Sequence, residues 1–256
     1  MELLDFGVRN LPPSLFTHAH VPVLQPQWGT HYRTLPVTFP TEKAAKGEVV
    51  ARLPLMADGL VHIDTDPCVT DIAAYPMSVE YMAPTYNDKA VKRVHVPDVA
   101  VRQADGSVVV IDYIPINVQL ANPWIKRRTR TLQNHMASIY ACSYAVHDER
   151  SVLAQPLFGN LKAMWAHKST ALDSPELQHV FQALRRCHFP SCLGDLKKTL
   201  RQVVELRPVF AAHDVDDVDI VFTVVMQMCI SGELDIDLST PFSAVTLVTS
   251  RKLRGA

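Results

Sequence analysis

Glycine is scarce in this sequence and long hydrophobic runs are missing, and both absences exclude classes of protein. Only nine of the 256 residues are glycine, and no phosphate-cradling glycine loop occurs among them. No apolar run reaches the roughly 20 residues that a membrane-spanning helix needs. The segment Met1–Asp5 carries acids where a secretory signal has bases. We therefore expect a cytoplasmic protein with no membrane partner.

Cysteine is also sparse, and charge of either sign is not in excess. The five cysteines are odd in number and scattered, which suits reduced thiols rather than a disulfide framework. The net charge is −1, so no overall field attracts nucleic acid, although a local basic patch can still do so. The chain also lacks a Gly-x-Ser-x-Gly elbow and a His-Glu-x-x-His helix, which leaves those two hydrolase classes without support.

Proline, in contrast, is frequent, and it is concentrated in the first half of the chain. Residues 1–40 are proline-rich and aperiodic, which predicts an extended arm over the surface with a short strand at Tyr32–Val37. A helix is predicted from Thr41, as its N-cap, to about Met56, with Pro54 weakening its far end.

From Val69 onward the hydrophobic period switches to two, which indicates strands. The predicted strands are Val69–Tyr75, Met77–Met82, Val91–Val101 and Ser107–Ile114. Asp105-Gly106 predicts a hairpin turn between the last two. A long helix then fits Pro123 to about Tyr140, followed by a strand at Cys142–Val146. This order predicts an α/β fold with a mixed sheet flanked by helices.

The second half of the chain changes to helical patterns. The predicted helices are Asn160–Lys168, Ser174–Arg186, Leu193–Leu206 and Asp214–Ile230. Two short strands follow, at Glu233–Asp237 and Ala244–Thr249. Helices followed by a small hairpin are the outline of a winged helix. We therefore predict an arm over 1–40, a mixed α/β domain over 41–155 and a winged-helix-like domain over 156–256.

Asp98 and Asp112 are the candidate catalytic and metal-binding residues. Each lies at the end of a strand-like segment, and the inferred hairpin places them opposite one another. Divalent-metal nucleases collect carboxylates around Mg²⁺ in this way. The alternative is structural, with Asp98 capping a bulge and Asp112 facing water at a strand end. Glu80 is expected to face outward, and His95 to face solvent or line a groove rather than bind a metal.

Two basic clusters are candidate DNA-binding sites, because Lys and Arg neutralise phosphates. The residues of the first are Lys126, Arg127, Arg128 and Arg130, and those of the second are Lys197, Lys198 and Arg201. The first cluster spreads around a helix, so only part of it faces any one partner. The second has i, i+3, i+4 spacing and lies on one face. A solvated helix surface is the competing interpretation of both.

The order of these segments resembles the TnsA-type endonuclease subunit of heteromeric transposases. The resemblance covers about residues 30 to 250. The matching segments are Phe39-Pro40-Thr41-Glu42-Lys43, Asp64-Thr65-Asp66-Pro67-Cys68-Val69, Tyr75-Pro76 with Val79-Glu80-Tyr81, and Val96-Pro97-Asp98. It implies a restriction-endonuclease-like domain, a winged-helix-like C-terminal domain, Mg²⁺ as cofactor, and DNA and a transposase-type protein as partners in transposition.

The chain departs from that family at its catalytic positions. The family's helix Glu falls near Ala51–Met56, where this sequence has no acid, and Glu48 lies several residues early. The family's Glu/Gln-x-Lys becomes Asp112-Tyr113-Ile114, so the Lys that steadies the attacking water or the developing charge is missing.

Whether the chain is an enzyme is therefore left open, with three readings. The first is a DNA-binding recombination subunit that keeps a nuclease fold and has lost most or all cleavage. The second is an active Mg²⁺-dependent endonuclease subunit that uses Asp98 and Asp112, with Glu80, Lys89 or Lys92 supplying the missing groups. The third is a mobile-element interaction protein with no DNA role, which the net charge of −1 allows.

Overall fold

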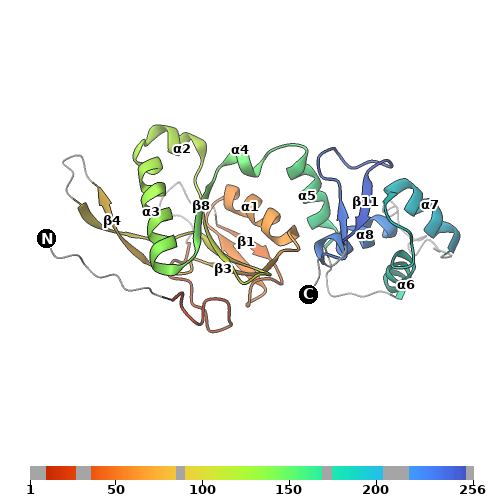
Figure 1. The fold of residues 1–256 in the computed structure, drawn as a ribbon, viewed down its shortest axis with the longest axis horizontal. Coiled ribbons are helices and arrows are strands. Elements are labelled where there is room, and N and C mark those ends of the chain that lie inside the picture. The colour runs from red at the N-terminus through yellow and green to blue at the C-terminus, as the bar shows by residue number, and fades with distance from the viewer. Residues whose placement is uncertain (1–9, 27–35, 85–89, 169–174, 204–218, 252–256) are drawn as a thin grey trace. The chain divides into compact units, whose positions relative to one another are not determined.

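The chain forms two compact units, each described here by itself. The computed structural model describes residues 10–26, 36–84, 90–168, 175–203 and 219–251 (Figure 1). Unit 1 comprises Met1–Asp64 and Cys68–Leu153, and unit 2 comprises Thr65–Pro67 and Ala154–Ala256. The sequence places the domain boundary after residue 155, whereas this division falls after Leu153. In the described parts of the chain, no helix has both the length and the apolar character to cross a membrane.

A four-stranded mixed sheet is the centre of unit 1. Its strands, in the order β3-β6-β7-β8, are Val69–Ala74, Val99–Gln103, Val108–Tyr113 and Ser143–His147. The first three are antiparallel, and β8 runs parallel to β7. A parallel neighbour needs a crossover, and helices α2 (Ile116–Ala121) and α3 (Trp124–Tyr140) supply it. The mixed α/β sheet flanked by helices is confirmed.

Helices pack on this sheet because alternate strand residues are apolar on both faces. Val110 of β7 lies in a buried cluster with Ala100 of β6 and with Leu132 and Met136 of α3. Tyr113 of β7 lies against Gly59 of α1 (Pro54–Thr65), where a Cβ would come within 2.0 Å of the ring. Helix α3 therefore packs on the sheet through large apolar side chains, whereas α1 packs on it through a glycine.

Two hairpins complete unit 1. One pairs β1 (Val37–Pro40) with β2 (Glu48–Ala51), and the other pairs β4 (Val79–Pro84) with β5 (Ala90–His95). A short helix, α4 (Glu149–Val152), follows β8.

The helix predicted over Thr41–Met56 is wrong. The β-branched pair Val49 and Val50 extends into β2 after a turn at Gly47, whose φ is +78°. Pro54 begins α1 instead of weakening a helix end, because the first turn of a helix tolerates a residue without an N–H. Thr41 is not an N-cap; its hydroxyl donates to the carboxylate of Asp64.

Two further expectations need correction. The strand predicted over Val91–Val101 is two strands in separate sheets, because Pro97 has no N–H to give to a central ladder. The predicted surface arm is partly core, since Leu15 is only 2% exposed and packs into the buried cluster of the sheet. Most of the strand predicted at Tyr32–Val37 lies outside the described residues.

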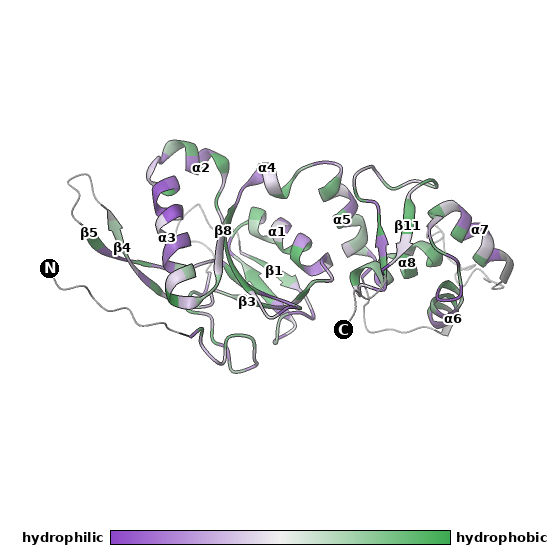
Figure 2. Cartoon of the chain, viewed as in Figure 1, coloured by the Kyte–Doolittle hydropathy of each residue, from purple (hydrophilic) through white to green (hydrophobic). Residues whose placement is uncertain are grey.

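The described residues of unit 2 form four helices and a small antiparallel sheet. The helices are α5 (Leu157–Ala166), α6 (Pro175–Leu184), α7 (Leu193–Val203) and α8 (Ile220–Ile230). The strands β9 (Ser191–Cys192), β10 (Leu234–Ile236) and β11 (Leu247–Ser250) pair in the order β10-β11-β9. The start of the helix predicted at Asp214–Ile230 lies outside the described residues. Figure 2 shows α8 as largely hydrophobic, in contrast to the hydrophilic α3 of unit 1.

Candidate functional site

The two predicted acids meet in the interior of unit 1. Asp112 lies in β7 and Asp98 immediately precedes β6, and the register that pairs Val99 with Ile111 sets them opposite each other. The backbone N–H of Asp98 donates to the Oδ1 atom of Asp112 at 3.2 Å. Asp98 and Asp112 are only 3% and 2% exposed. The structure therefore brings them together, and neither faces water.

Arg52 holds the Asp98 carboxylate from the end of β2. Its Nε donates to Oδ1 at 2.5 Å and its Nη2 donates to Oδ2 at 2.9 Å, which is the strong two-point geometry of an arginine–carboxylate pair. Oδ2 also accepts the backbone N–H of Tyr113 at 2.7 Å. The same Nη2 donates to the carbonyl of Tyr113 at 2.8 Å. Arg52 thus links the end of β2 to β7, both directly and through Asp98.

Asp112 is held by a second group of residues. Its Oδ2 atom accepts a hydrogen bond from the Tyr144 hydroxyl of β8. The Nε2 atom of His95 lies 2.7 Å from the same oxygen, and a guanidinium nitrogen of Arg128 in α3 lies 3.6 Å from it. The His95 side chain is 15% exposed, so of the two positions expected for it the solvent-facing one is not found, and the groove-lining one stays a prediction. The end of β5 and the first turns of α3 therefore both contribute to this site.

The two carboxyl groups have pKa values displaced in opposite directions. Burial raises the pKa of Asp98, and the ion pair with Arg52 offsets this only in part while Asp112 adds repulsion. Burial acts in the same direction on Asp112. There the bond to His95, the Tyr144 hydroxyl and the charge of Arg128 outweigh it and lower the pKa. Asp98 is thus the carboxylate of the pair that is protonated first as the pH falls.

Mg²⁺ is the cofactor implied by the family resemblance, and this donor set does not fit it. Mg²⁺ needs carboxylate oxygens that are free to coordinate, in near-octahedral geometry with several waters. All four carboxylate oxygens of the pair already accept from donors, and the two guanidinium groups balance the two carboxylate charges. A divalent ion here would add two uncompensated positive charges. Across the described residues, no group of three or more His, Cys, Asp or Glu side chains is arranged to hold a metal.

The side chains considered as replacements for the missing Lys and Glu lie elsewhere. Glu80 and Lys92 form an ion pair at 2.8 Å across the β4–β5 hairpin, and both are well exposed. Glu80 therefore faces outward, as expected. Lys89 lies outside the described residues. Ile114, at the position of the family's Lys, is buried and 6% exposed.

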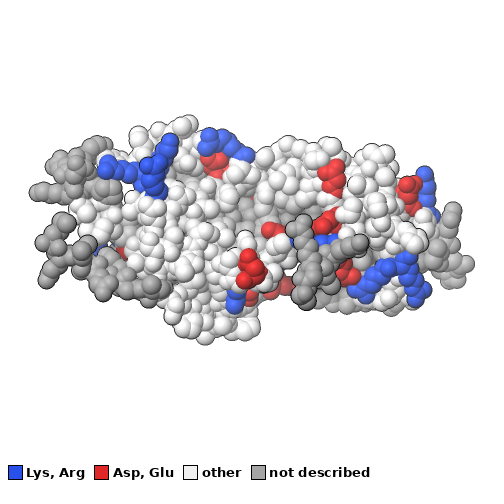
Figure 3. Space-filling model, viewed as in Figure 1, with Lys and Arg blue, Asp and Glu red and all other residues white. Residues whose placement is uncertain are grey.

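The basic cluster of α3 divides between the interior and the surface. Arg128 turns toward Asp112, whereas Lys126, Arg127 and Arg130 are exposed. The chain has no Asp or Glu between Asp112 and Asp148, so α3 carries no acid of its own. Figure 3 shows Lys and Arg side chains over α3, and the acidic side chains visible in that view lie over other elements. These exposed residues form an acid-free positive surface on unit 1, which we call the α3 basic face.

The basic cluster of α7, in unit 2, is largely neutralised. Lys197 pairs with Asp219 at 2.5 Å, and Lys198 lies 3.9 Å from Asp195. Arg201 is exposed. Of the two predicted clusters, the α3 basic face therefore has more positive charge that is not paired with a described acid.

Sequence reasoning missed Arg52 and Tyr144. Arg52 is the one charged residue in the apolar stretch from Val49 to Met56, which is a weak signal for a buried ion pair. It also falls within Ala51–Met56, the stretch in which the family resemblance places a catalytic Glu. Tyr144 gives no signal, because a tyrosine in a buried strand is common.

Comparison with known proteins gives no independent evidence on function. No protein-family model matches the chain, and no curated protein matches it. Function is therefore inferred from the acid pair, from the α3 basic face and from the sequence motifs.

Proposed function

We propose that this chain is a TnsA-like DNA-binding subunit of a recombination system, built on a restriction-endonuclease-like domain with little or no cleavage activity. In this proposal unit 1 contacts DNA phosphates through the α3 basic face. The site that holds Mg²⁺ in an active nuclease is instead closed by arginine. A transposase-type partner then supplies the cleavage chemistry.

The two-point ion pair of Arg52 with Asp98 carries this proposal. A nuclease of this class needs its carboxylates free to bind the ion that activates water. Here the guanidinium of Arg52 occupies the position that the metal ion would take. Because the site is largely buried, the attraction between Arg52 and Asp98 is less screened than at the surface. Ile114, at the position of the family's Lys, acts in the same direction, because it offers no ammonium to stabilise the developing phosphorane charge.

The α3 basic face supports the DNA-binding half of the proposal. Phosphate binding needs cations that are exposed and not already paired, and it needs no acids nearby to repel the backbone. Lys126, Arg127 and Arg130 are exposed, form no ion pair with a described acidic residue, and lie in a segment without acidic residues. The local charge thus differs from the near-neutral total of −1.

We propose that unit 2 is a winged-helix-like domain, which the order of its described elements supports. Its elements run α6, β9, α7, α8, β10, β11, with β11 pairing to both other strands. The third helix of such a domain usually enters the major groove. Here α8 has no charged residue and buries Val224, Val225 and Met226. We infer that α8 supports the core of unit 2 and does not read bases.

The proposal is tested by neutralising the α3 basic face and measuring duplex-DNA binding by fluorescence anisotropy over a range of salt concentrations. The test variant changes Lys126, Arg127 and Arg130 to Gln. The matched control makes the same change in total charge at exposed positions on other elements. The control positions are Lys46, Lys162 and Arg186.

We expect the test variant to lose about tenfold or more in affinity. Its plot of log affinity against log salt should lose roughly one unit of slope for each phosphate contact removed. The control should stay close to wild type, because none of its charges belongs to the α3 basic face. Equal losses in both variants would instead indicate a general charge effect, and no binding by the wild-type chain would favour an interaction protein without a DNA role.

A further inference from the structure

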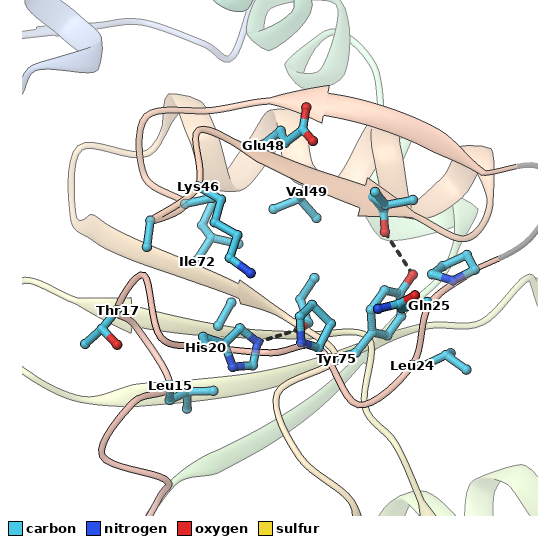
Figure 4. A pocket seen from close by; sticks show the side chains of 17 residues that line it. Leu15, Thr17, His20, Leu24, Gln25, Lys46, Glu48, Val49, Ile72 and Tyr75 are labelled. Atoms are coloured by element: carbon cyan, nitrogen blue, oxygen red, sulfur yellow. Dashed lines mark hydrogen bonds between the residues drawn. The ribbon is translucent and has the colours of Figure 1, made fainter.

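Unit 1 contains a cavity that has no part in the proposed DNA function. It has a volume of about 390 Å³, within the range of about 300–1,000 Å³ common for small-molecule sites. Its walls come from the N-terminal segment, from the turn and strand that lead through β2, and from β3 (Figure 4). The acid pair does not line it. The cavity is therefore a site of its own.

The floor and one wall of the cavity are apolar and firmly packed. Val49 of β2 and Ile72 of β3 line it and are each only 3% exposed, and Leu15 lines it from the N-terminal segment. Leu24 lines the same cavity while remaining 42% exposed. A ligand in the cavity would cover apolar surface that water now reaches, which is favourable.

Hydrogen bonds fix the N-terminal segment across the opening. The N–H of Val23 donates to the Tyr75 carbonyl at 3.0 Å, and Nε2 of His20 lies 2.9 Å from the Ala74 carbonyl. A carbonyl only accepts, so this His20 nitrogen carries the proton. The Tyr75 hydroxyl donates to the Val50 carbonyl at 3.0 Å. These three polar groups thus already have partners within the walls and tie the N-terminal segment to β3 and to Tyr75.

Lys46 directs a positive charge into the cavity. Figure 4 shows its ammonium reaching into the hollow, whereas the carboxylate of Glu48 points away from His20 and Tyr75. No ion pair to Lys46 is formed by the described acidic residues, in contrast to Lys92 and Lys197. A single cation above an apolar chamber matches a ligand with one negative charge and an apolar body. A phosphate dianion would call for more donors.

We propose that this cavity binds a small amphipathic carboxylate, with its apolar body against Val49, Ile72 and Leu24 and its carboxylate at Lys46. The proposal is independent of the DNA-binding function, since no residue of the α3 basic face or of the acid pair lines the cavity.

The test is a titration of the full-length chain with straight-chain carboxylates from hexanoate to dodecanoate, below their micelle-forming concentrations, by calorimetry. We expect one saturable site whose affinity rises about fourfold with each added methylene until the cavity is full, and then levels off. Decanol and decylamine serve as matched ligands that keep the apolar body and remove or reverse the charge. Amide shifts in NMR spectra should concentrate at Leu24, Lys46 and Ile72.

Two variants at exposed positions test the carboxylate contact and the apolar contact of the ligand separately. Lys46→Gln should weaken decanoate about five- to tenfold and leave decanol unchanged, because only the carboxylate uses the ammonium. Leu24→Ser should weaken both ligands. Lys162→Gln, in unit 2, is the control. The proposal is overturned if the wild-type chain shows no saturable site, if Lys46→Gln binds decanoate as wild type does, or if the shifts lie away from the cavity.

Discussion

Arg52 determines the electrostatics of the buried acid pair. Two carboxylates face two guanidinium groups, those of Arg52 and Arg128, so these four charges balance. Burying such a group is costly unless every charge is paired. The side chain that satisfies Asp98 therefore also makes the site unsuitable for a divalent ion.

Replacing Arg52 should both weaken the fold and open the site to metal. Arg52→Gln leaves Asp98 buried without its partner, which typically costs about 3–5 kcal/mol of unfolding free energy. The remaining negative charge should attract Mg²⁺ or Mn²⁺, and binding to the folded state alone raises the melting temperature. Thermal melts with and without millimolar metal measure this effect.

We expect the melting temperature of Arg52→Gln to rise with metal and that of wild type to stay unchanged. Arg185→Gln is the control, because it breaks an exposed two-point ion pair with Glu233 and leaves no buried charge. An equal rise in wild type would show that the native pair already binds the ion. That result would favour the active nuclease.

At the scale of the elements, α1 approaches the sheet through a position that only glycine fits. A Cβ on Gly59 would lie 2.0 Å from the Tyr113 ring, and Tyr113 is 1% exposed and has no space to move. Gly59→Ala should therefore lower the unfolding free energy by about 1–3 kcal/mol despite the better helix propensity of alanine. Urea unfolding followed by circular dichroism measures the change.

The matched control for this prediction is Gly159→Ala in α5. There the nearest atom to a new Cβ is the flexible end of the Gln155 side chain, at 2.9 Å. The change should be neutral or stabilising by up to about 1 kcal/mol, as helix propensity predicts. Equal effects of the two substitutions would argue against the close packing of α1 on β7.

The strand β8 carries a histidine that should make stability depend on pH. Burial lowers the pKa of His147, nearby His62 lowers it further, and Asp148 offsets part of the shift. An unfolded histidine has a pKa of about 6.5. The stability that comes from the neutral imidazole is thus complete above this value and is lost as the pH falls through it, since the unfolded chain takes up the proton first.

His147→Gln should flatten this dependence. We expect denaturant unfolding of wild type to show falling stability from about pH 7 to pH 5, and the variant to show a shallower slope. His167 in unit 2 also has a lowered pKa caused by burial, so part of the slope should remain. An unchanged slope in the variant would remove His147 as the source.

Local sequence patterns predicted the elements well wherever the period was regular. The alternation around β3, β7 and β8 and the Asp105-Gly106 turn gave the central sheet and the opposition of Asp98 and Asp112. The patterns failed at Pro54, which begins a helix instead of weakening its end, and at Pro97, which divides one predicted strand into two. They also missed Arg52, because its partner lies 46 residues away in sequence and periodicity carries no information on such contacts.

At the scale of the whole molecule, function depends on where charge is available rather than on its total. The net charge is −1, yet the segment between Asp112 and Asp148 is free of acids, and α8 is free of charge altogether. DNA binding without cutting is the property that this distribution predicts. It combines the exposed α3 basic face with an acid pair that is internally neutralised.

The most direct test follows binding and cleavage of one end-labelled DNA duplex in the same reactions, with Mg²⁺ or Mn²⁺, for wild type and for Asp98→Asn. The account predicts salt-dependent binding to DNA that stays intact with both proteins. Strand cleavage by wild type that disappears in Asp98→Asn would contradict it and establish an active nuclease.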